Sequence, residues 1–447
     1  MIQVFAALLL AVSAGRAQQS SPQPKDFSFT PVDLELLDKS NQLDKQFQKE
    51  GLVYNDLDTT KYITKVGQAV LPEGPELQNV HWQFFAMRDT TPNAFALPNG
   101  SIYVHTGLLA VLENEAQLAS VLAHEETHVL NRHGYLENRS YRKKMATANI
   151  LGGIASAGSF AGGAGGGASL MLSALMPSLF MSSVNGYSRE LEREADLRAV
   201  QAMVDADYSA EEMPIVFKLL QQSHEVETAQ NFYQDHPKLQ DRAVYVSEMA
   251  NSLHTRSAHP KIEADGYLLD TESAVRHDVE LEIRGGRART AVWVMEHVVK
   301  RDAKLAENFY ELGEGYRGLG PHTPEPTSEE LSRQGKSDTR KKLSKMTPQE
   351  YEESLLKTPD GQEAWKSNQE KAEQAYQKAI ELSPAYAAPH RGLGFLFERG
   401  HQPELSAREF HQYLELAPAA LDLPQIKRRM ETMEKEITNQ PLPAAAN

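Results

Sequence analysis

Residues 121–134 read VLAHEETHVLNRHG and carry two histidines four residues apart, His124 and His128. On an α-helix, residues four apart lie on the same face, so the two rings can bind one cation through their nitrogens. Glu125 follows the first histidine and can take a proton from water held by that cation. The same pattern is also found in ordinary exposed helix turns, so a third ligand elsewhere in the chain has to decide between the two interpretations.

A second helical segment supplies carboxylates. Residues 188–196 read SRELEREAD, which places Glu192 and Asp196 four apart on one face. One of them can ligate a metal while the other orients a ligating histidine. The alternative is a salt-bridged solvent face, but Ala195 and Ala199 interrupt the charges, as expected where two helices pack closely.

The segment 79–106 has β character, with aromatic and β-branched residues and Pro-Asn and Asn-Gly turns. We expect a hairpin that pairs HWQFFAM with SIYVHTG or with NAFAL. From Asn114 the pattern becomes helical. Asn114 and Gln117 can form a capping box there, and Gly134 is the expected end of the helix.

Length and composition limit the class of protein. A chain of 447 residues favours two domains. Its 46 Lys and Arg against 61 Asp and Glu give a net charge of −15, which argues against binding to nucleic acid. The chain has no cysteine, which excludes disulfides, thiolate metal sites and a lipid anchor on an N-terminal cysteine.

Two apolar segments bear on location. The run Val4–Val12 ends in small residues and is too short to span a bilayer, so we expect a signal peptide over residues 1–17 and an exported protein. The alternative is a buried or disordered terminus. Met145–Ser188 carries no charge and is rich in glycine, which favours a lid beside an active site; membrane contact is the alternative.

Similar residues recur every 34 positions in the C-terminal part of the chain. Three pairs stand 34 residues apart: Tyr376 and Phe410, Leu382 and Leu416, and Pro384 and Pro418. This spacing and the small residues near Gly313 and Gly394 predict tetratricopeptide-like helical repeats, with a polar insertion between them. An unrelated α-helical domain is the alternative.

Three stretches together resemble a known family: HEETHVLNRH, YSRELEREAD, and NAFALPNGSIYVHTGLL at residues 93–109. They look like the HtpX and CAAX-prenyl-protease family of zinc metallopeptidases, most closely its soluble periplasmic BepA-like branch with C-terminal tetratricopeptide repeats. The resemblance covers residues 30–255 with specific motifs and the repeats more loosely.

The resemblance implies a role for each matching residue. His124, His128 and Glu192 would ligate one Zn²⁺ per chain, Glu125 would be the general base, and Asp196 would support a ligand from the second shell. DHPKLQDR matches a family segment in which His236 either blocks the metal reversibly or, with Arg242, stabilises the oxyanion. The strand residues Asn93, Ala94, Phe95 and Ala96 would pair with an extended substrate.

We therefore expect an α+β fold: a mostly α-helical zincin-type catalytic domain with a small β-sheet, followed by an all-α repeat domain. The expected segments are a signal peptide (1–17), a metallopeptidase domain (18–255), a linker (256–285), repeats (286–435) with an insertion near 320–366, and a disordered tail (436–447).

The expected function is an exported, periplasmic endopeptidase, peripheral to a membrane if residues 145–188 touch one. It would cleave unfolded or misassembled envelope proteins, and its repeats would recruit a partner such as envelope assembly machinery. The rival hypothesis is a repeat-based adaptor or chaperone whose metal site is structural or held shut. An intact Glu125 and only three protein ligands favour catalysis.

Overall fold

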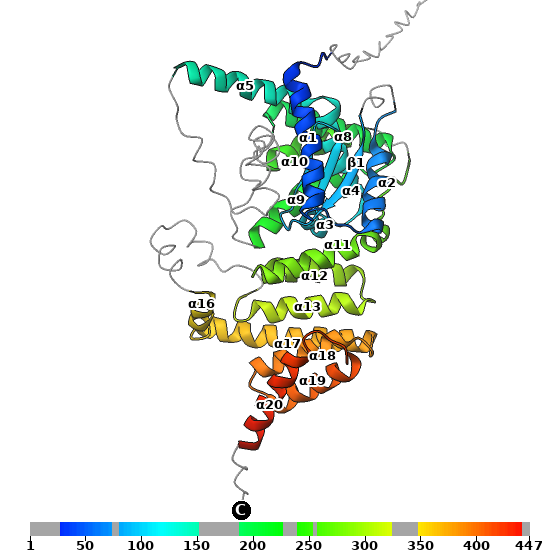
Figure 1. Cartoon of the computed structure of the whole chain (residues 1–447). Coiled ribbons are helices and arrows are strands. Elements are labelled where there is room, and N and C mark those ends of the chain that lie inside the picture. Colours follow the sequence, from blue (N-terminus) through cyan, green and yellow to red (C-terminus); the bar gives the residue numbers. More distant parts are fainter. Residues whose placement is uncertain are drawn as a thin grey trace, which may run out of the picture.

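The structure is a computed structural model of the chain (Figure 1). The predicted signal peptide and His236 lie outside the residues that it describes, as do most of the neutral run and parts of the insertion and of the tail. Within the described residues, no helix is both long enough and apolar enough to cross a membrane. The described ranges are 27–73, 80–151, 187–226, 239–253, 257–323 and 347–439.

A three-stranded sheet lies in the N-terminal half, with strand order β1-β3-β2. The central strand β3 (Ser101–His105) is buried along its whole length, and β2 (Ala94–Ala96) runs antiparallel to it. The predicted hairpin was a different one, in which HWQFFAM pairs with SIYVHTG or with NAFAL. The prediction was wrong for β1 (Gln83–Met87), which runs parallel to β3, because the chain passes from β1 to the far edge before it returns through the centre.

Helices cover both faces of the sheet, and the alternation along β3 decides which helix meets which face. Tyr103 belongs to a cluster with Leu36, Leu43 and Phe47 of α1 (Pro31–Lys49). Its neighbours Ile102 and Val104 belong to the larger cluster with α2 (Leu57–Val70) and α4. The sheet is thus held between α1 on one side and α2 with α4 on the other. The remaining helices of this half are α3 (Thr106–Val111), α4 (Glu115–Leu130), α5 (His133–Leu151), α8 (Arg189–Asp205), α9 (Glu212–Val226) and α10 (Leu239–Ser252).

The C-terminal half is a stack of helices below the sheet domain in Figure 1. Most of the predicted linker 256–285 is the helix α11 (Ala264–Arg284), whose Tyr267 is buried in the N-terminal core and donates a hydrogen bond to the carbonyl of Leu109. The predicted fold class, α+β followed by an all-helical part, is confirmed. After α11 come α12 (Ala288–Arg301), α13 (Ala306–Leu319), α16 (Pro348–Leu355), α17 (Pro359–Leu382), α18 (Ala387–Arg399), α19 (Pro403–Leu416) and α20 (Leu423–Asn439).

The small residues singled out in the sequence lie where aromatic rings cross a helix. A Cβ on Gly313 of α13 would come 2.6 Å from Tyr376 of α17, and one on Gly394 of α18 would come 2.5 Å from Phe410 of α19. Tyr376 and Phe410 are both fully buried. Two helix pairs therefore use the same ring-on-glycine contact, and the two rings stand 34 residues apart, which supports the proposal of a repeated unit.

One buried carboxyl in this half makes stability depend on pH. Burial, then Glu280 and Glu314, raise the pKa of Glu311 to about 8, although Arg276 and Arg284 oppose them. A carboxyl whose folded pKa exceeds its unfolded value of 4.5 takes up protons on folding, so its contribution to stability falls as pH rises from about 4.5 to 8. Glu311→Gln should therefore stabilise the protein more at pH 8.5 than at pH 5, by at least about 1.4 kcal/mol, the equivalent of one pKa unit.

Chemical denaturation at the two pH values measures this difference. Glu307→Gln, on the exposed side of the same helix, is the control and should leave the pH dependence as it is in the wild type. The same gain at both pH values for Glu311→Gln would contradict the prediction.

Candidate metal centre and active site

Local hydrogen bonds fix the helix that carries the histidine pair. The side chain of Asn114 accepts a hydrogen bond from the backbone N–H of Gln117 (2.9 Å), which is one half of the predicted capping box. The other half does not form, because the side chain of Gln117 accepts from the backbone N–H of Glu113 at 2.7 Å. The helix ends earlier than predicted: the residue in the left-handed conformation is Arg132, at φ 60°, and not Gly134. The chain reverses at Arg132 and α5 starts at the next residue.

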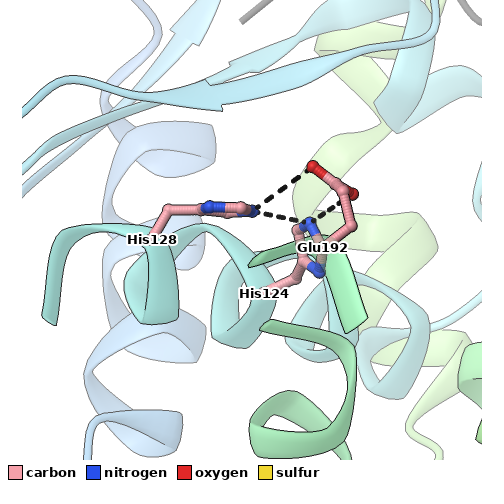
Figure 2. Close-up of side chains that lie close together, drawn as sticks. All are labelled: His124, His128 and Glu192. Carbon is pink, nitrogen blue, oxygen red and sulfur yellow. Dashed lines mark hydrogen bonds and ion pairs between the residues drawn. The ribbon is translucent and has the colours of Figure 1, made fainter. Parts of the chain in front are cut away.

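Three side chains from α4 and α8 converge on one point (Figure 2). The Nε2 atoms of His124 and His128 lie 3.0 Å apart. Glu192 Oε2 lies 3.6 Å from Nε2 of His124, and Glu192 Oε1 lies 3.8 Å from Nε2 of His128. All three donor atoms lie within 4.8 Å of one another. The two segments that the sequence paired thus come together.

This donor set fits a divalent cation such as zinc. Two ring nitrogens and one carboxylate oxygen are ligands that zinc commonly takes, and three protein ligands leave a coordination position for a reactant. In both histidines it is Nε2 that faces the partner ligands, while Nδ1 lies next to a separate hydrogen-bonding group. If both rings act as ligands, their Nε2 lone pairs face each other at 3.0 Å, and a shared cation would relieve the repulsion between them.

A buried ionic network contacts two of these ligands, His124 and Glu192, and fixes their orientation. Asp196 Oδ1 lies 2.9 Å from Nδ1 of His124, as expected for a group that orients a ligand. The guanidinium of Arg242 donates to both oxygens of Asp196, at 2.9 and 2.7 Å, and lies 3.3 Å from Glu192 Oε2. Tyr245 also donates to Asp196. Burial alone would raise the pKa of Asp196, but Arg242 and His124 outweigh it and hold that pKa well below the usual value.

Arg242 and His236 were candidates for stabilising an oxyanion. Arg242 is 5% exposed, and its guanidinium is engaged by two carboxylates, which favours a positioning role over direct contact with substrate. His236 lies outside the described residues.

Glu125 lines an open cavity together with all three candidate ligands. Desolvation in this cavity raises the pKa of Glu125 to about 7, and Glu192 adds to the rise, while His124, Arg242 and a hydrogen bond from the Ala96 N–H oppose it. A carboxyl poised near neutrality beside a metal centre suits a general base.

The edge of β2 faces this cavity. Asn93 and Leu97 hydrogen-bond to β3 through their backbones, at 2.9 and 2.8 Å. In an antiparallel pair, alternate residues bond to the partner, so the main-chain groups of Ala94 and Ala96 point to the free edge. Because β2 is an edge strand and the cavity is lined by the residues Asn93, Ala94, Phe95 and Ala96, an extended chain can be added here.

Two aromatic side chains at the centre were not predicted. Nδ1 of His133 lies 2.9 Å from Nδ1 of His128. Tyr187 stacks on His128, with ring centroids 4.0 Å apart and planes at 16°, and its backbone N–H donates to Glu192 Oε1. Both residues stand inside the quoted segments, but no spacing rule relates either of them to His128, because a turn and a loop place them there.

Comparison with protein families supports this site. Residues 58–250 match the model of peptidase family M48. They contain the histidine pair, Glu125, Glu192, Asp196 and Arg242.

Several characterised or named proteins are similar to parts of the chain. A putative beta-barrel assembly-enhancing protease of Vibrio cholerae serotype O1 is 31% identical over 172 residues, or 38% of this chain and 34% of its own length. The beta-barrel assembly-enhancing protease of Escherichia coli K12 is 27% identical over 223 residues, 47% of this chain and 42% of its own. Mitochondrial metalloendopeptidase OMA1 of Schizosaccharomyces pombe is 29% identical over 150 residues, 33% of this chain and 40% of its own. The chain thus spans less than half the length of each of these relatives.

Proposed function

We propose that the protein is a zinc-dependent endopeptidase that cleaves unfolded or misassembled proteins of the cell envelope, and the match of residues 58–250 to the model of peptidase family M48 supports this proposal. The observation that carries the proposal is the convergence of His124, His128 and Glu192 beside Glu125 in one open cavity. A metal site that is purely structural has four protein ligands, whereas a catalytic site keeps one position open.

The residues around the centre have distinct tasks. A bound zinc ion supplies Lewis acidity, which lowers the pKa of water and polarises a substrate carbonyl. Glu125 accepts the proton from the attacking water and can return it to the leaving amine. The N–H of Ala96 holds the Glu125 carboxylate until substrate arrives. Asp196 orients the ring of His124, and Arg242 fixes Asp196 and Glu192 together.

We assign substrate binding to the free edge of β2. Main-chain groups of Ala94 and Ala96 pair with an extended segment of substrate, next to Glu125. Such pairing recognises backbone more than side chains, and it is open only to a chain that has no secondary structure of its own at the cleavage site. This supports a preference for unfolded or misassembled proteins.

The wider role follows from the relatives. Two of them are named for enhancing β-barrel assembly, which supports a place in quality control of envelope proteins. We propose that the protein is exported to the periplasm by residues 1–17, that residues 145–188 form a lid or touch a membrane, and that the helical half recruits an assembly partner. We also propose that residues 18–255 form the catalytic domain and that residues 286–435 form the repeat domain.

Removal of the metal tests the core of the proposal. Purified protein should contain one zinc ion per chain and degrade unfolded casein, and a chelator such as 1,10-phenanthroline should abolish that cleavage, since three nitrogen and oxygen ligands bind zinc reversibly. Returning zinc should restore it. Casein cleavage that persists after the zinc is shown to be gone would rule out the mechanism.

A further inference from the structure

His128 has a second hydrogen-bonding partner that the proposed mechanism does not yet use. Its Nε2 faces the other ligands, so its Nδ1 points away from them and meets Nδ1 of His133 at 2.9 Å. We propose that His133 is a positioning residue: it accepts the Nδ1–H of His128, and so fixes the tautomer and the ring angle that turn Nε2 toward the metal. This inference rests on the proposed function, because it takes His128 as a zinc ligand.

Only one distribution of protons over the rings of His128 and His133 leaves Nε2 of His128 free to bind a metal. For Nε2 of His128 to offer its lone pair, the proton of that neutral ring must be on Nδ1. The neighbouring Nδ1 of His133 must then be the acceptor, which places the proton of His133 on its own Nε2. A neutral His133 is required, and burial of the ring favours the neutral form.

In the part of the chain that the structure describes, no group near His133 competes with His128 as its hydrogen-bond partner. Its side chain is 1% exposed, and its Nε2 lies 3.7 Å from Oε2 of Glu194, which is beyond hydrogen-bond length. Glu194 instead accepts from Asn131 at 2.7 Å. Among the described residues, the contact with His128 is therefore the hydrogen bond that holds the ring of His133 in place.

The backbone turn explains how a residue only five positions later reaches His128. Arg132 adopts φ 60°, a left-handed conformation that is unfavourable for a residue other than glycine. Its guanidinium lies over the rings of Phe27 and Phe29, 4.5 and 5.3 Å from their centroids, which helps to hold the turn. The ring of Tyr187 lies against both histidines: it stacks on His128 and is edge-on to His133.

The two ligand histidines are thus supported differently. His124 has a carboxylate, Asp196, at its Nδ1, whereas His128 has a neutral imidazole at 2.9 Å. Both arrangements orient the ring, and loss of such a partner typically weakens metal binding about 10–100-fold.

A matched pair of variants separates hydrogen bonding from packing. Asn and Leu have the same branched shape, and Oδ1 of Asn stands where Nδ1 of His stands, so His133→Asn keeps an acceptor that His133→Leu lacks. Zinc affinity, measured by competition with a chelator of known affinity, should be about 10–100-fold weaker in His133→Leu than in His133→Asn. Unfolding of the zinc-free proteins should show similar stability for the two variants.

Equal zinc affinities in the two variants would overturn the inference, because the contact would then be packing alone. Should His133→Leu not fold, nitrogen-15 NMR of histidine-labelled, zinc-loaded wild type decides instead. An unprotonated Nδ1 on His133 supports the proposal, and a protonated one overturns it. Wild-type protein that binds no zinc would overturn the proposed function together with this inference, whereas tight binding in the wild type and in both variants would overturn this inference alone.

Discussion

Glu125→Gln is expected to slow the cleavage of unfolded casein by about 1000-fold, the middle of the range for loss of a general base. Glutamine keeps the shape of the side chain and can still accept the hydrogen bond from the Ala96 N–H, but it cannot take a proton from water. Because Glu125 is not one of the three converging ligands, the variant should bind zinc as the wild type does. Turnover of labelled casein and metal content, measured on the same preparation, check both statements.

Glu126→Gln is the matched control. Glu126 stands next in the same helix, but it does not line the cavity, and burial raises its pKa well above the usual value. Glutamine has nearly the same shape and brings no charge into this buried position, so cleavage should stay within about twofold of wild type, the scatter expected of a neutral change. Wild-type turnover in Glu125→Gln would rule out the assignment of the base, and equal losses in both variants would point to damage to the helix.

Helical periodicity predicted which residues of the centre share a face, and the family resemblance assigned Glu192 to the metal and Asp196 to the support of a ligand. His124 with His128 and Glu192 with Asp196 each stand four apart, so each pair shares a face wherever its helix forms. The structure brings both faces together, with Asp196 at Nδ1 of His124 as predicted. These predictions succeeded because they needed only local geometry and one contact between two helices.

Features that depend on non-local geometry were not predictable from the sequence. The parallel pairing of β1 with β3 depends on which strand takes the buried centre, and strand propensity does not encode that order. His133 reaches His128 through a left-handed Arg132, a conformation that sequence rules assign to glycine and so predicted at Gly134. His236 is outside the described residues, so its role stays a prediction.

Arg242 shows how a correct location can carry a different role. The family resemblance placed it at the centre, where it does lie, but the sequence could not say whether its charge faces substrate or protein. In the structure its three nitrogens face Asp196 and Glu192, two buried carboxylates that would otherwise repel each other. An arginine fork suits this task because it can bind one carboxylate with two nitrogens and reach a second with the third.

Arg242→Met should therefore lower the free energy of unfolding by about 3–5 kcal/mol, the usual cost of removing one partner from a buried ion pair. Methionine fills much of the same space but leaves the Asp196 carboxylate buried next to Glu192 without a countercharge from this side. The pKa of Asp196, now well below its usual value, should rise in the variant. Chemical denaturation near neutral pH measures the loss, and the deficit should be smaller at about pH 4, where the carboxylates of the variant can protonate.

Arg142→Met is the control, since Arg142 pairs with Glu35 at 3.0 Å on the surface, where both side chains are more than 40% exposed. Solvent screens that pair, so its removal should leave the free energy of unfolding close to that of the wild type. A similar small loss in both variants would mean that Arg242 adds no more than a surface charge does, and the role of Arg242 in holding the ligands would have to be abandoned. A large loss at neutral pH that shrinks in acid points to the two carboxylates themselves, because lost packing would destabilise the protein equally at either pH.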